Sequence, residues 1–133
     1  MSRVLITSFG FAHLEREGLS ADSLAAHVVV DLRVHFRDPH VSPALRGLTA
    51  DDPAVRAHVL ATPGIRELVD ALVKVVAAYA AGPVTAPVHV AVGCAGGRHR
   101  APSTARELGR LLRERGVEVG LVDLHLDREV ISR

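Results

Sequence analysis

A strand of buried character that runs directly into a glycine-rich turn is the strongest constraint this sequence places on its fold. Residues 88–102 are V-H-V-A-V-G-C-A-G-G-R-H-R-A-P. The alternating Val88, Val90 and Val92 are typical of a buried strand, and Pro102 suits the first turn of a helix. The segment therefore predicts a strand, a tight turn and a helix in direct succession, as in an α/β domain with a parallel sheet.

The turn between this strand and this helix is expected to bind an anion. Gly93, Gly96 and Gly97 let the backbone turn sharply. A helix N-terminus presents unpaired N–H groups, which commonly bind phosphate. Arg98, His99 and Arg100 surround it, and an arginine can hold phosphate with two parallel hydrogen bonds. We therefore expect the partner to be a phosphorylated small molecule.

The rest of the chain predicts a single α/β domain over residues 1–133, with a partly parallel central sheet of about four strands flanked by helices. The glycine-rich turn follows the third strand, inside a βαβ unit. Strands are expected at residues 3–8, 27–32, 89–92 and 117–124, and helices at 53–60, from 63 to about 81, and at 102–115. Residues 10–19 and 33–47 are expected to be loops. In parallel sheets ligands bind beyond the carboxyl ends of the strands, so Asp31 and the residues after it should approach the glycine turn.

Composition narrows the function further. The net charge is +1, so no overall basic character points to nucleic acid. A single cysteine excludes an internal disulfide, and no leader or membrane-length apolar run is present, which favours the cytoplasm and no membrane partner. The 8 histidines are scattered without ligand spacing. We therefore expect no metal and no cofactor.

Other interpretations of the turn remain open. Cys94, Gly97 and Arg100 match the C-x-x-G-x-x-R spacing of cysteine-dependent phosphatases, in which the thiolate attacks phosphorus and the arginine holds its oxygens. Gly93 and Ala101 depart from the usual flanking residues of those enzymes, and the one general acid the sequence offers is Asp38. The patterns of nucleotide-hydrolysing and dinucleotide-binding loops are absent. In a purely structural turn, Cys94 would be a small buried hydrophobe.

Several segments together resemble the C-terminal domain of the RNase adapter protein RapZ family. The similar segments are G-C-A-G-G-R-H-R at residues 93–100, D-L-R at 31–33, D-P-H at 38–40 and S-F-G-F at 8–11, in the same order and spread over nearly the whole chain. Members of that family carry an N-terminal P-loop domain that is absent from this sequence. The resemblance therefore implies a free-standing domain without the nucleotide-binding activity of that part.

The resemblance implies a regulatory or adapter domain that senses glucosamine-6-phosphate and binds small regulatory RNA, and it favours self-association into an oligomer. Catalysis is not required for such a role. The implied sugar-phosphate site comprises Asp31, His40, Cys94, Ala95, Gly96, Gly97, Arg98, His99 and Arg100. Ala95 and Ala101 stand where the family carries hydroxyl residues.

RNA or protein binding would have to use a local basic surface. Arg106, Arg110 and Arg113 follow one another at helical spacing and form such a face on the helix after the glycine turn. Glu107 and Glu114 lie beside them in the sequence, so the same face is also compatible with an ordinary solvated helix surface.

Overall fold

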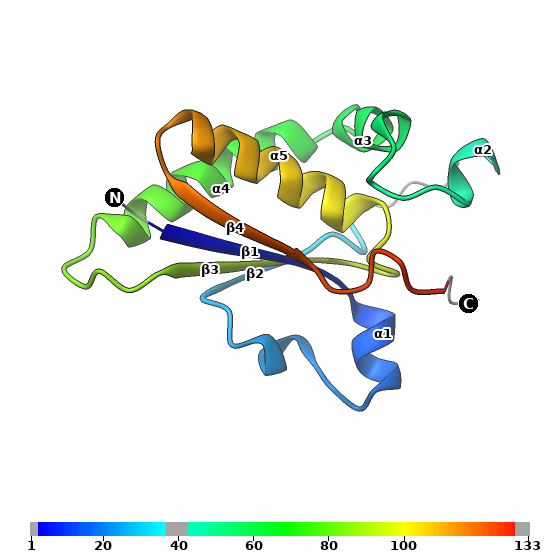
Figure 1. Cartoon of the computed structure of the whole chain (residues 1–133), viewed down its shortest axis with the longest axis horizontal. Coiled ribbons are helices and arrows are strands. Elements are labelled where there is room, and N and C mark those ends of the chain that lie inside the picture. The colour runs from blue at the N-terminus through cyan, green and yellow to red at the C-terminus, as the bar shows by residue number, and fades with distance from the viewer. Residues whose placement is uncertain (1–2, 37–42, 130–133) are drawn as a thin grey trace.

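The computed structural model describes residues 3–36 and 43–129. Four strands and several helices alternate along the chain (Figure 1). The elements are β1 (Arg3–Gly10), α1 (Phe11–Arg16), the 3-10 helix η1 (Ala21–Leu24), β2 (Val28–Asp31), α2 (Pro43–Arg46), α3 (Pro53–Leu60), α4 (Ile65–Ala80), β3 (Val88–Cys94), α5 (Arg100–Glu114) and β4 (Glu118–Asp123).

The four strands form one sheet in the order β2-β3-β1-β4, and every pair is parallel. This confirms the predicted α/β class, and the sheet of the described residues is fully rather than partly parallel. The helices α3, α4 and α5 cover one face, while α1 and η1 lie on the other (Figure 1). All four strands therefore end at the same edge, where a parallel sheet places its ligands.

The main core lies between the sheet and the α4 and α5 helices. Alternate side chains of β1 and β3 point toward it, and α4 and α5 contribute stripes at helical spacing. Its fully or almost fully buried members include Val4, Ile6, Val90, Val92, Ile65, Val69, Val76, Ala105, Leu108 and Leu112. Burying one such side chain contributes roughly 1.5–3 kcal/mol, so this layer holds α5, and with it the glycine turn, firmly in place.

Several local predictions were wrong. Residues 10–19 are not a loop throughout, because they contain α1, whose Phe11 and Leu14 pack with Phe9 and Ala91 in a second apolar cluster. The predicted 33–47 loop likewise contains the single-turn helix α2. The helix that was predicted to begin at residue 63 is α4, and it begins at Ile65. Gly64, the residue before it, has φ +92°.

Tyr79, near the end of α4, lies outside the core. The Tyr79 side chain is 47% exposed and its hydroxyl donates to the His27 carbonyl over 3.5 Å. No helix in the described part of the chain combines the length and the apolar content needed to cross a membrane.

Candidate functional site

The carboxyl ends of the strands converge beside the glycine turn, residues 95–99. Gly10 pairs in register with Cys94, Asp31 with Gly93, and Ser8 with Asp123. The first and second of these pairings place the turn between the ends of β1 and β2. The glycine turn and the residues after Asp31, which were expected to approach each other, therefore follow neighbouring strands of the sheet.

The glycines of this region have different roles. Gly97 has φ +77°, a conformation that favours glycine, and a Cβ there would lie 2.7 Å from the Gly10 nitrogen. Gly93 belongs to β3 rather than to the turn, and a Cβ there would lie 2.5 Å from the rings of Phe9 and Phe11. By contrast, a Cβ on Gly96 would meet nothing within 4 Å. Gly96 thus marks the open side of the turn.

Cys94 lies beneath the turn, at the end of β3. Its side chain is 2% exposed, and its sulfur accepts a hydrogen bond from the Gly97 amide over 3.3 Å. The thiol therefore packs as a small buried group that also holds the turn in shape. An incoming substrate would have to pass the turn to reach the sulfur.

A second loop, residues 47–51, is hydrogen-bonded to the turn. The Ala50 amide donates to the Arg98 carbonyl over 3.0 Å, and Arg98 Nη2 donates to the Gly47 carbonyl over 3.5 Å. The His99 Nε2 lies 2.6 Å from the Leu48 carbonyl, so this nitrogen carries the proton and donates it. Backbone contacts thus fix the orientation of the His99 ring.

Burial lowers the pKa of His99 below the ordinary histidine value. The hydrogen bond to the Leu48 carbonyl acts in the opposite direction, and the nearby charges of Arg98 and Arg100 lower the pKa further. The ring is therefore neutral at neutral pH.

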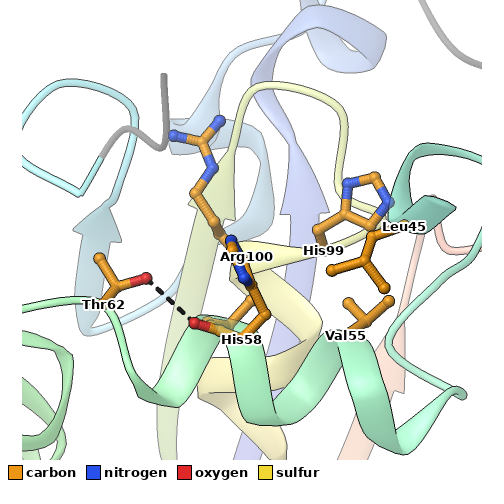
Figure 2. Close-up of a pocket in the computed structure, with 7 residues that line it drawn as sticks. Leu45, Val55, His58, Thr62, His99 and Arg100 are labelled. Carbon is orange, nitrogen blue, oxygen red and sulfur yellow. Dashed lines mark hydrogen bonds between the residues drawn. The ribbon is translucent and has the colours of Figure 1, made fainter. Parts of the chain in front are cut away.

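A pocket of about 110 Å³ opens beside the start of α5, between the turn and α3 (Figure 2). It is smaller than the roughly 300–1,000 Å³ typical of drug-sized ligand sites, which suits a small metabolite or part of a larger one. Its lining is mainly apolar and includes polar groups on more than one side (Figure 2). The lining residues are Leu45, Val55, His58, Val59, Thr62, His99 and Arg100.

Arg100 supplies the positive charge of this region. Its guanidinium extends away from α3, as Figure 2 shows, and Nη1 donates to the Leu32 carbonyl over 3.3 Å. That is its one side-chain hydrogen bond within residues 3–36 and 43–129, and no carboxylate in those ranges forms an ion pair with it. Most of its donors are therefore not used by the described residues and can bind an anion.

Asp31, the predicted partner from the other loop, is held by Arg33. The guanidinium of Arg33 donates to both carboxylate oxygens, with the shortest side-chain distance at 2.9 Å. These bonds lower the pKa of Asp31, and the more distant charge of Arg100 adds a smaller effect in the same direction. The carboxylate is thus ionised and near Arg100, but it does not line the pocket.

Of the residues predicted for the site, His99 and Arg100 line the pocket, residues 95–98 form the turn behind it, and Cys94 ends β3 beneath the turn. His40 and the candidate acid Asp38 lie outside the described residues. Sequence reasoning missed His58 and Thr62, which form part of the far wall on and just after α3; the Thr62 hydroxyl donates to the His58 carbonyl over 3.4 Å. In the sequence, the four-residue spacing of His58 and Thr62 at the end of a helix does not indicate a binding site.

The predicted basic face on α5 is largely engaged by acidic side chains. Arg106 Nη2 lies 2.8 Å from an Asp51 oxygen and 3.1 Å from one of Asp123. Similarly, Arg110 contacts Glu107 and Glu114. These acidic partners offset the positive charge with which the arginines would bind the phosphates of an RNA backbone. RNA binding by this face therefore stays a prediction.

The described residues contain no group of three His, Cys, Asp or Glu side chains arranged to hold a metal ion. Within the described residues, the pocket lining contains one arginine, no lysine and no carboxylate. The arrangement can therefore bind an anion that carries a small, partly apolar body.

Comparison with known proteins places the chain in a family. The RapZ C-terminal domain family matches residues 2–127. Similar proteins include a nucleotide-binding protein of Thermobifida fusca, 38% identical over 96% of this chain, and one of Rubrobacter xylanophilus, 43% identical over 95%. The aligned part is 42% and 40% of those two proteins, so the chain spans about two-fifths of their length. The glycine turn, the parallel sheet and this match together show that the chain belongs to the RapZ C-terminal domain family.

Proposed function

We propose that this domain binds a phosphorylated small metabolite at the glycine turn and acts as a regulatory or adapter module. A sugar phosphate such as glucosamine-6-phosphate is the expected ligand. The observation that carries the proposal is Arg100, whose guanidinium stands at the start of α5 beside a pocket with most of its donors unused by the described residues. The N-terminus of a 15-residue helix favours the same negative charge.

The geometry favours binding over Cys94-dependent phosphate transfer. Cys94 does not line the pocket, and it is only 2% exposed. A nucleophile must come within about 3–3.5 Å of the phosphorus it attacks. The apolar wall formed by Leu45, Val55 and Val59 instead suits the carbon skeleton of a ligand whose phosphate lies toward Arg100.

The relatives named as nucleotide-binding proteins keep nucleotides among the ligands to be tested. A nucleotide and a hexose phosphate share the phosphate and differ in the body attached to it. The pocket of about 110 Å³ favours the smaller body.

The test is a binding screen of the purified chain by thermal shift and calorimetry. The panel contains inorganic phosphate, sulfate, hexose phosphates, glucosamine-6-phosphate and nucleotides. One sugar phosphate should raise the melting temperature in proportion to its concentration over Kd. In Arg100→Ala its affinity should fall roughly 10- to 150-fold, which corresponds to about 1.5–3 kcal/mol for a lost charged hydrogen bond.

Arg66→Ala is the matched control, because Arg66 lies on α4, its side chain is 67% exposed, and it is outside the pocket. It removes the same charge and should leave affinity unchanged. Equal losses of affinity in Arg66→Ala and Arg100→Ala would show that the ligand is attracted only by the net charge of the protein and not by a site at Arg100. Unchanged affinity in Arg100→Ala would overturn the proposal.

A further inference from the structure

Two buried histidines from opposite ends of the chain meet behind the glycine turn. His13 lies on α1 and His125 follows β4, and their rings stack with centroids 4.9 Å apart and an interplanar angle of 29°. The exposed fractions are 0% and 4%, respectively. No other side-chain feature of the described structure brings two titratable rings together in the interior.

The His125 ring joins the end of β1 to the turn. The Gly10 amide donates to His125 Nδ1 over 2.8 Å, in a buried hydrogen bond that requires this nitrogen to be unprotonated. The Cβ of His125 also lies 3.0 Å from the position of a Cβ on Gly97. A proton on Nδ1 would replace an attraction with a contact between two donors.

Neither ring nitrogen of His13 has a hydrogen-bond partner within residues 3–36 and 43–129. The nearby Glu129 favours a proton on the ring through its backbone and its charge, but burial has the larger effect and disfavours it. A charged imidazole in such a place carries a large desolvation penalty. With both rings charged, two like charges would also be held in stacking contact.

The charged side chains around His13 and His125 do not offset the free-energy cost of protonating these two rings. Arg128 and Arg16 face His13, and Arg128 also faces His125, each disfavouring a proton; Glu129 and Glu17 act in the opposite direction. Those two carboxylates are already bound, Glu129 to Arg16 over 2.9 Å and Glu17 to Arg128 over 3.1 Å. Burial is the largest cause that lowers the pKa of both histidines.

The segment that carries His125, residues 124–129, covers one side of the turn. The Leu124 amide donates to the Ser8 carbonyl over 3.0 Å, and Arg98 of the turn donates to the Arg128 carbonyl over 2.7 Å. Leu126 is 8% exposed. The segment is thus fixed to both β1 and the turn, and the histidine pair lies in the middle of its contacts.

We propose that the His13–His125 pair is a pH-dependent latch: protonation breaks the Gly10–His125 hydrogen bond and releases residues 124–129 from the glycine turn. Release removes the Arg128 carbonyl from Arg98 and the His125 side chain from Gly97, so the turn loses one of its supports. The 47–51 loop, which contains no histidine, and the Ala12 amide, which donates to the Ala95 carbonyl over 3.1 Å, stay in place. The latch does not require a ligand at the turn.

The test follows amide hydrogen exchange by NMR from about pH 7.5 to about pH 5, the range in which histidine titrates, with rates corrected for their intrinsic pH dependence. Protection of the Gly10 and Leu124 amides should fall about tenfold or more as the rings titrate, since a pKa difference of one unit corresponds to a tenfold population change. Protection of Val90, in the centre of the sheet, should not change. A parallel loss at Val90 would mean general unfolding and would overturn the proposal.

The double variant His13→Phe/His125→Asn removes both titrating groups. Phenylalanine keeps a flat ring for stacking, and the asparagine side-chain oxygen can accept from the Gly10 amide in place of Nδ1. The variant should keep residues 124–129 protected over the whole pH range. His35→Asn, at an exposed histidine far along the chain from both rings, should behave as the unaltered protein.

The unaltered protein also decides the question by itself if the double variant fails to fold. The ring signals of His13 and His125 are followed in the same titration as the Gly10 amide. Titration of the rings with no change in Gly10 protection would overturn the latch, and so would a double variant that loses protection as the unaltered protein does.

Discussion

The Gly10 nitrogen lies 2.7 Å from the position that a Cβ on Gly97 would occupy. The end of the first strand and the middle of the glycine turn are therefore in backbone contact, with no room for a side chain between them. A Cβ on Gly10 would in turn lie 2.5 Å from the Gly96 carbonyl carbon. Both surfaces are backbone, which cannot move aside as a flexible side chain would.

Gly97→Ala should therefore destabilise the protein strongly. The substitution adds a backbone clash and places alanine at φ +77°. A left-handed conformation alone costs a non-glycine residue about 1–3 kcal/mol, so a loss of about 2 kcal/mol or more in the free energy of unfolding is expected. Urea denaturation measures it. A loss below about 0.5 kcal/mol, the range of ordinary surface changes, would contradict the packing described for this turn.

Gly96→Ala is the matched substitution one residue earlier. A Cβ there meets no atom within 4 Å, and Gly96 is not among the residues with positive φ. The free energy of unfolding should change by less than about 0.5 kcal/mol. Affinity for the sugar phosphate should fall, because the new methyl group stands on the open side of the turn. Full affinity in a stable variant would show that the ligand does not approach the backbone at Gly96.

The different surroundings of these glycines show how much of the turn could be predicted from the sequence. The spacing of glycines before a helix predicted a tight anion-binding turn, but it could not separate the roles of its members. Gly93 is required by the Phe9 and Phe11 rings, and Gly97 by the Gly10 backbone. Both reasons depend on residues about 80 positions away in the chain, and local patterns do not record such contacts.

The fold was predictable to a similar extent. Alternating valines and the 3.6-residue stripes of α4 and α5 predicted the strands and the long helices, because burial repeats regularly in them. Helix α1 was missed, since it has six residues, a glycine N-cap without a side-chain hydrogen bond, and a polar histidine at a fully buried position. The wall of the pocket formed by His58 and Thr62 was missed because only the packing of α3 beside α5 brings it to the turn.

The free energy of unfolding should decrease as the pH falls below about 6.5, the ordinary pKa of histidine. The pKa values of His13, His89, His99 and His125 are lowered, with burial the largest cause in each. The unfolded chain then binds more protons than the folded protein once the pH drops past about 6.5, so the free energy of unfolding decreases from there until the lowered folded values are reached. Above about pH 7.5 these residues are neutral in both states and contribute no slope.

Urea denaturation at a series of pH values measures this slope. His99→Gln and His125→Asn should each flatten part of it, while His35→Asn, at an exposed position, should leave it unchanged. A free energy of unfolding that stays constant between about pH 7.5 and about pH 5 would contradict the burial of these rings.

Cys94→Ser tests the alternative chemistry of the turn. The buried sulfur lies outside the pocket lining, so the unaltered protein should hydrolyse an aryl phosphate no faster than the variant. Both proteins are assayed at a temperature at which circular dichroism shows them folded. Turnover by the unaltered protein that disappears in Cys94→Ser would establish the thiol as a nucleophile and reverse the preference for binding.

The central position of β1 has a consequence for how the chain is made. Residues 3–10 leave the ribosome before both of their neighbours in the sheet, β3 at residues 88–94 and β4 at 118–123. At synthesis rates of about 5–20 residues per second, the nascent strand waits for several seconds with both edges open. An apolar strand with unpaired edges can pair with other chains. Newborn chains, and any product that ends before β4, are therefore the forms of this protein that most need a chaperone.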